Sequence, residues 1–107
     1  MVKLMRDSVF TQQFSIGASG LKVAVKDSID VAAYPTMLGS ASLENVAPAN
    51  EHSDVVNQVL SGGCELVGKL NMHEFAFGMT GVNYWSGTPL NPLFPNYIPG
   101  GSSSGSA

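Results

Sequence analysis

The sequence predicts an α/β fold, and the prediction rests on three segments in the order strand, helix, strand. Residues 20–27 hold alternating apolar residues, residues 53–61 carry apolar residues at helical spacing, and residues 64–70 form a second apolar run. Strands that alternate with a helix in this way indicate a βαβ unit within a parallel or mixed sheet. The chain has 107 residues, which is at most one domain.

The first strand follows a segment with weak signals, residues 1–19, which we expect to be an N-terminal helix or linker. Leucine and valine then alternate with small or polar residues over 21–25, which predicts a strand that ends near Lys26. Proline, glycine and asparagine recur over residues 35–51. That composition predicts a loop between the strand and the helix.

The helix is expected to start at Ser53, which is a good N-cap, with the Asp54 carboxylate in the first turn, where it suits the helix dipole. Its apolar residues fall on one face: Val55, Val56, Val59 and Leu60. Gly62 and Gly63 supply a stop signal. The apolar run over residues 64–70 then predicts a second buried strand.

A long ordered loop is expected from Gly78 onward, because glycine and proline punctuate the chain from there to its end. Just before it, residues 73–77 are expected to begin a short helix. Four large apolar side chains of this region are expected in the core: Met72, Phe75, Phe77 and Met79. The chain ends inside a Gly/Ser block, so we expect residues 20–107 to be the N-terminal part of a longer domain.

Composition limits the function classes. Charged residues make up 12% of the chain, about half of the roughly 25% usual in soluble domains, which suggests a surface that more chain would bury. A neutral, Gly- and Ser-rich surface is the alternative. The net charge of −3 with only five Lys and Arg argues against nucleic acid as a direct partner. No apolar run is long enough to span a membrane, and a lone cysteine fits a reducing compartment, so a cytoplasmic location is expected.

Lys26, at the end of the first strand, has two interpretations. A lysine there is commonly a solvated charge. Burial instead disfavours the ammonium form and lowers a lysine's pKa, which makes the amine usable as a base, and Ser–Lys pairs are a known variant of serine catalysis. The Gly/Ser tail, residues 100–107, could by itself be a flexible linker. It fits a phosphate-binding loop poorly, because no lysine follows the glycines.

Metal and cysteine chemistry are not expected. His52, His73 and Cys64 lack the spacing of a metal site. A Cys–His nucleophile pair is possible in principle, but Cys64 lies in an apolar strand pattern, where a small core residue is the better interpretation.

Taken together, ordered segments of the chain resemble the amidase signature family over about residues 20–107. The matching segments are Val23–Asp27 with Asp30, Pro35-Thr36, Gly39-Ser40, Val67–Phe75, Gly81-Val82-Asn83, Gly87–Pro92 and Pro99–Ala107. They occur in the family's order and at its approximate spacing, which takes weight from the linker interpretation of the tail. The resemblance implies one α/β/α domain around a large mixed sheet.

The resemblance also implies a Ser–cis-Ser–Lys triad. Lys26 matches the family's general base, and Ser102 matches the bridging serine that follows a cis peptide bond after Gly101. Ser103 matches a supporting serine. The nucleophilic serine and its oxyanion hole lie further along the chain in this family, so the 107 residues are expected to be inactive alone.

The implied reaction of the complete enzyme is hydrolysis of a small-molecule amide, with no metal and no organic cofactor. Three residues are expected to line one wall of the acyl pocket: Ala76, Gly78 and Thr80. A homodimer of the full-length protein is left open. Two alternatives remain: a glutaminase like that of the glutamyl-tRNA(Gln) amidotransferase, which needs partner subunits, and a non-catalytic remnant or interaction module.

Overall fold

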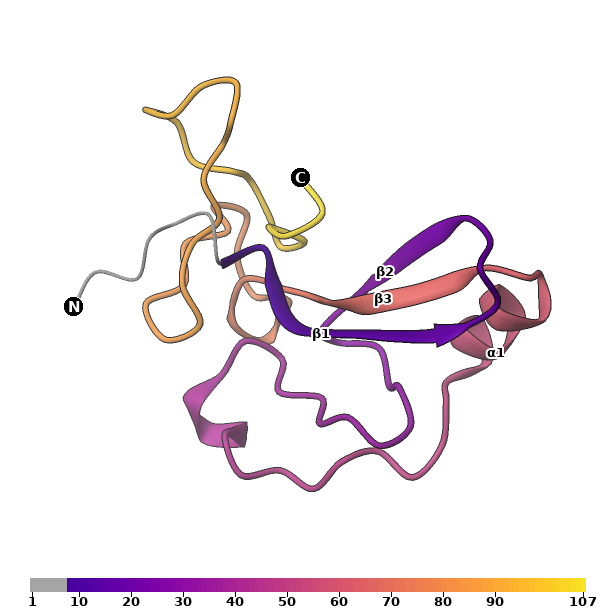
Figure 1. Cartoon of the computed structure of the whole chain (residues 1–107). Coiled ribbons are helices and arrows are strands. Elements are labelled where there is room, and N and C mark those ends of the chain that lie inside the picture. Colours follow the sequence, from indigo (N-terminus) through magenta and orange to yellow (C-terminus); the bar gives the residue numbers. More distant parts are fainter. Residues whose placement is uncertain (1–7) are drawn as a thin grey trace.

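The computed structural model describes residues 8–107, and its centre is a three-stranded mixed sheet in the order β1-β3-β2 (Figure 1). The strands are β1 (Phe10–Gly17), β2 (Lys22–Lys26) and β3 (Glu65–Leu70). β2 runs parallel to β3, whereas β1 runs antiparallel to it. Because the β2-to-β3 connection contains the helix α1 (Asp54–Ser61), the predicted βαβ unit and mixed sheet are confirmed.

The strand β1 corrects the prediction of a helix or linker over residues 1–19. That prediction is wrong for residues 10–17, which pair with β3, and residues 1–7 lie outside the described part of the chain. The burial of β1 alternates along its second half, where Phe14 and Ile16 pack against the core. Its pairing partner lies about fifty residues away in sequence, at Leu66 for Ile16, so local sequence could not reveal it.

The helix α1 follows the predicted boundaries. Ser53 precedes it with extended backbone, although its hydroxyl makes no cap hydrogen bond, and Gly62 ends it. Val56 is fully buried and Leu60 packs against the core. The Val55 side chain is 47% exposed, because its position lies at the edge of the helix's apolar stripe.

A small core lies between α1 and one face of the sheet. Its buried members are Val25, Val31, Val56 and Leu66. The ring of Phe14 stacks on Tyr34 beside them, with centroids 4.1 Å apart, so β1 is tied to the loop after β2. Met72 is buried as predicted, but Phe75, Phe77 and Met79 are exposed, because the segment that carries them turns away from the sheet.

Long loops leave the end of the sheet where β2 and β3 both finish. The predicted loop is confirmed, since residues 78–107 contain neither helix nor strand. In Figure 1 this loop, orange to yellow, lies beyond that end of the sheet. Short 3₁₀ segments interrupt the other loops at Ala41–Leu43 and at Glu74–Ala76. The second lies where a short helix was expected, but Phe75 and Ala76 have φ +52 and +59, so it is an irregular turn and not a regular helix. No helix within residues 8–107 is long and apolar enough to cross a membrane.

Candidate active site

The candidate site is built around a contact between Lys26 and Ser102. Lys26 is the last residue of β2, and its Nζ donates a hydrogen bond to Oγ of Ser102 over 2.6 Å. Both residues are partly buried, and 76 positions separate them in the sequence. The resemblance pairs these two residues, and the fold brings them into direct contact.

The loop that carries Ser102 is attached to the segment that follows β3. The peptide bond between Gly101 and Ser102 is cis, as the resemblance implies. The carbonyl of Ser102 accepts a hydrogen bond from the His73 amide over 2.9 Å, and the Gly105 amide donates to the Asn71 carbonyl over 2.9 Å. The end of β3 therefore holds the serine loop, just as β2 holds the lysine.

The two serines that follow Ser102 have different environments. The Ser103 carbonyl accepts hydrogen bonds from the amides of Ser106 and Ala107, over 3.0 and 3.2 Å. Its hydroxyl makes no hydrogen bond to any residue in the described part of the chain. The hydroxyl of Ser104 is buried without a partner among residues 8–107. Backbone turns, rather than side-chain contacts, shape this end of the loop.

Two buried asparagines organise the loops around the serine. The Asn71 side chain donates to the carbonyls of Ser8, Ser86 and Gly87, and its oxygen accepts from the Met72 amide and the Ser86 hydroxyl. Asn83 bridges two further loops in the same way, from Nδ2 to the carbonyls of Gly39 and Met72 and from the amides of Trp85 and Ser86 to Oδ1. Amide side chains with all groups paired make such a cluster rigid.

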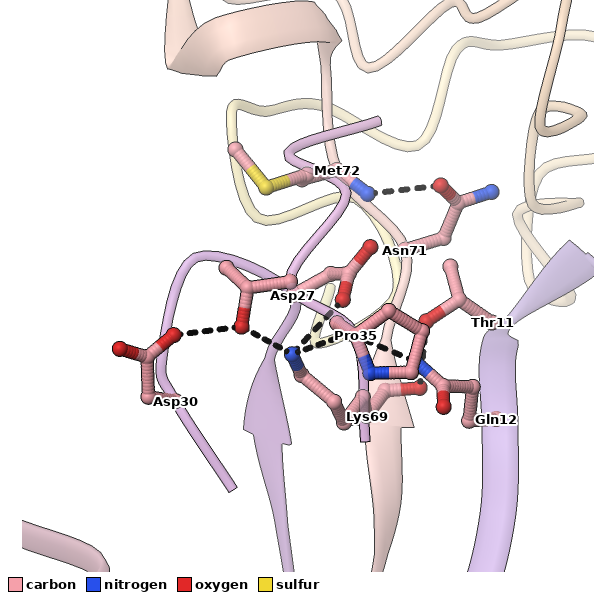
Figure 2. A network of polar contacts seen from close by, with 9 residues as sticks. Thr11, Gln12, Asp27, Asp30, Pro35, Lys69, Asn71 and Met72 are labelled. Carbon is pink, nitrogen blue, oxygen red and sulfur yellow. Dashed lines mark hydrogen bonds and ion pairs between the residues drawn. The ribbon is translucent and has the colours of Figure 1, made fainter. Parts of the chain in front are cut away.

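A second lysine, Lys69 of β3, lies in a polar network close to the first one (Figure 2). Its Nζ lies 3.0 Å from Oδ1 of Asp27, 2.8 Å from Oγ1 of Thr36 and 2.9 Å from the Pro35 carbonyl. Lys69 and Asp27 are both fully buried. The oxygen atoms of Asp27, Thr36 and Pro35 thus surround the ammonium.

Asp27 is the residue directly after Lys26. Burial raises the pKa of its carboxyl above the ordinary 3.8, and the charge of Lys69 opposes that rise, as do the amides of Met37 and Gly39 that face the carboxyl. Asp27 and Lys69 interact as an ion pair. Among residues 8–107, no N–H or O–H group makes a hydrogen bond of acceptable geometry to either carboxylate oxygen of Asp27.

The three residues expected to line an acyl pocket do not all border one hollow. Ala76 and Thr80 are exposed, and Gly78 packs against the ring of His73. Thr80 and His73 line a hollow of about 600 Å³ together with Trp85 and other residues. Ala76 and Gly78 do not line that hollow.

The histidines and the cysteine have local roles. His52 accepts a hydrogen bond from the Ala32 amide at Nδ1 over 3.0 Å, and Thr80 lies 3.4 Å from Nδ1 of His73. Cys64 is a partly buried free thiol. Within residues 8–107, the acidic, histidine and cysteine side chains form no group of three that could hold a metal ion.

Sequence reasoning found Lys26 and Ser102 but missed the network around Lys69. Lys69, Asp27 and Asn71 entered only as letters of matching segments, without roles. The available signal was a lysine inside an otherwise apolar strand, because such a residue needs a buried partner.

Comparisons with known proteins identify relatives of the chain. A family model described as Amidase matches residues 10–107. The chain is 39% identical to fatty acid amide hydrolase of Medicago truncatula over 91% of its length, and 43% identical to mitochondrial outer envelope protein 64 of Arabidopsis thaliana over 83%. It spans only 17% and 15% of those two proteins. The solved structure of a glutamyl-tRNA(Gln) amidotransferase subunit from Thermotoga maritima superposes with a TM-score of 0.80 at 30% identity, over 92% of this chain and 23% of that one.

Proposed function

The chain belongs to the amidase signature family, and from that premise we propose that it supplies the lysine and the bridging serine of a Ser–cis-Ser–Lys triad. The complete enzyme would hydrolyse a carboxylic amide to an acid and an amine or ammonia. Because the chain spans about a sixth of the curated relatives named above, this activity is proposed for the full-length protein.

One observation carries the proposal: the hydrogen bond of 2.6 Å between Nζ of Lys26 and Oγ of Ser102. A solvated lysine would have no reason to meet a serine 76 positions away. The partner is a hydroxyl, which can both accept and donate a proton. The pair can therefore relay a proton in either direction.

The proposed reaction begins with Lys26 as a neutral amine. The amine takes the proton of Ser102, and Ser102 takes the proton of the attacking serine of the complete enzyme. That serine adds to the amide carbonyl and forms an acyl-enzyme. The proton returns through Ser102 to the leaving amine, and water then releases the acid by the same relay.

The proposed mechanism places the attacking serine and the oxyanion donors outside these 107 residues. Loss of one oxyanion donor commonly lowers kcat by about 10²–10³-fold, and loss of the nucleophile removes the covalent route. We therefore propose that the 107-residue chain does not turn over amides by itself.

A second candidate is glutamine hydrolysis within an amidotransferase. The superposition on the glutamyl-tRNA(Gln) amidotransferase structure, with a TM-score of 0.80, favours it. The chain has the run Ser102-Ser103-Ser104-Gly105 and not Ser-Ser-Gly-Gly, and this difference favours an amidase instead. Glutamine must therefore be among the substrates assayed.

The test is ammonia release by the full-length protein from glutamine and from a panel of simple carboxamides. Lys26→Ala and Ser102→Ala should each lower kcat by about 10²–10⁴-fold, the usual contribution of a proton-transfer group. Lys22→Ala is the matched control, because Lys22 is an exposed lysine on the same strand, and it should keep full activity.

Full activity of a folded Lys26→Ala protein would refute the triad. Turnover by the 107-residue chain itself would show that one of its own serines is the nucleophile. Preference for glutamine over every carboxamide in the panel would select the glutaminase alternative.

A further inference from the structure

The network around Lys69 connects three parts of the fold. The ammonium contacts Asp27 after β2 and the Pro35-Thr36 segment, and Gln12 of β1 donates to the same Pro35 carbonyl over 2.9 Å. Figure 2 shows Asp27 and Pro35 beside Nζ of Lys69, with Gln12 next to Pro35. Thr36 continues the network by donating to Oδ1 of Asp30 over 2.6 Å. The titratable groups brought together here are Asp27, Asp30 and Lys69.

This network lies on the face of the sheet opposite the Lys26 side chain. Successive side chains of a strand point to opposite faces, so Asp27 points away from the face that Lys26 occupies. The register pairs Val25 with Lys69, which places Lys69 on the face of Val25 and Asp27. The Asp27 amide extends the ladder by donating to the Leu70 carbonyl over 2.9 Å.

The same short stretch of β3 also leads directly to the serine loop. Two residues after Lys69, Asn71 accepts from the Gly105 amide, and His73 donates to the Ser102 carbonyl, each over 2.9 Å. A shift of the β2 end against the β3 end would therefore change the distance between Lys26 and Ser102.

We propose that the Lys69–Asp27 ion pair is a positioning device for the proton relay, which holds the end of β2 against β3 so that Lys26 meets Ser102. The inference rests on the proposed function. The pair also keeps the nearby buried charge balanced, because one cation faces one carboxylate. Neither residue touches the reacting atoms, so both act through Lys26.

The experiment compares kcat and KM of the full-length amidase with those of Asp27→Asn and Lys69→Met. Each variant should lose about 10–10²-fold in kcat, the loss expected from misplacing a catalytic group by about 1 Å, with KM within about twofold of the parent.

A milder pair of variants keeps the test decisive if the ion-pair variants do not fold. Thr36→Val removes one partner of the Lys69 ammonium and should lower kcat about threefold, since a hydrogen bond to a charged group is lost and part of that loss reaches the relay. Thr11→Val is the matched control, because Thr11 donates only to the Lys69 backbone carbonyl, over 3.3 Å. That control should leave kcat unchanged.

An unchanged kcat in folded Asp27→Asn, or equal kcat in Thr36→Val and Thr11→Val, would overturn the inference. A loss that appears in KM alone would also overturn it. Lys26→Ala, assayed in parallel, separates this result from failure of the proposed function: an inactive Lys26→Ala beside a fully active Asp27→Asn refutes only the positioning role.

Discussion

Lys26 and Lys69 lie at neighbouring positions of two paired parallel strands, yet their side chains have different surroundings. Lys69 is fully buried and its ammonium faces a carboxylate, a hydroxyl and a carbonyl. Lys26 is partly buried, and its contact is the hydroxyl of Ser102. Within residues 8–107, no carboxylate pairs with Lys26.

The difference shows how one fold can give two lysines separate tasks. If Lys69 lost its proton, Asp27 would remain as a buried carboxylate without a counterion, which is costly in a low dielectric. Ser102 is neutral, so a proton can leave Lys26 without stranding a charge. A carboxylate partner therefore marks the structural lysine, and a neutral hydroxyl without a carboxylate marks the proposed base.

The largest expected effect in this comparison is on stability. Lys69→Met leaves Asp27 buried without its cation, and breaking a buried ion pair typically costs about 3–5 kcal/mol of unfolding free energy. Lys26→Met removes one partly buried hydrogen bond, for which about 1 kcal/mol is usual. Urea unfolding of the full-length variants measures both values.

Equal losses of stability in the two variants would show that both lysines are structural. A Lys69→Met protein as stable as the parent would show that Asp27 finds another partner or takes up a proton.

A smaller effect is expected from a substitution at Gly81. This glycine lies against the loop that carries Ser102, the partner of Lys26. Gly81 has φ +74, and a Cβ there would collide with the Gly100 carbonyl, next to the serine loop. Gly81→Ala should therefore lower kcat and cost about 1–3 kcal/mol from overpacking, in addition to the left-handed backbone penalty. Gly63→Ala is the matched control, because φ is +81 and nothing lies within 4 Å of the added Cβ.

The control should cost only the left-handed backbone penalty of about 1–2 kcal/mol and leave kcat intact. If both glycine variants lost kcat equally, the close approach of Gly81 to the serine loop would be irrelevant to the relay.

The smallest effect is the pH dependence that Asp27 adds to stability. Its folded-state pKa is raised above 3.8 chiefly by burial, so between those two values the folded chain binds more protons than the unfolded chain. The contribution of Asp27 to stability is therefore present below pH 3.8 and is lost as the pH rises through the folded-state pKa.

Unfolding free energies of the parent and Asp27→Asn, measured from about pH 4 to about pH 7, check this sign. The parent-minus-variant difference should fall with rising pH and then level off. A difference that rises with pH would mean that the attraction of Lys69 outweighs burial, and it would make Asp27 a fully paired carboxylate.

Local sequence signals were sufficient to predict the two strands and the helix that bury apolar side chains. The alternation before Lys26, the Ser53 boundary of α1 and the apolar run that ends at Leu70 each follow from periodicity and capping. β1 was not predictable in this way. Its polar glutamines obscure the pattern, and its partner strand is remote in sequence.

By itself, the sequence determined the α/β pattern, the long loop after Gly78 and, through the resemblance, the residues Lys26 and Ser102. The packing of strands and loops settled which of the two lysines pairs with a carboxylate. The physical reason is that contacts such as Lys26–Ser102 and Lys69–Thr36 join residues 76 and 33 positions apart. No local rule sets such distances, because strand pairing and loop packing together bring those atoms into contact.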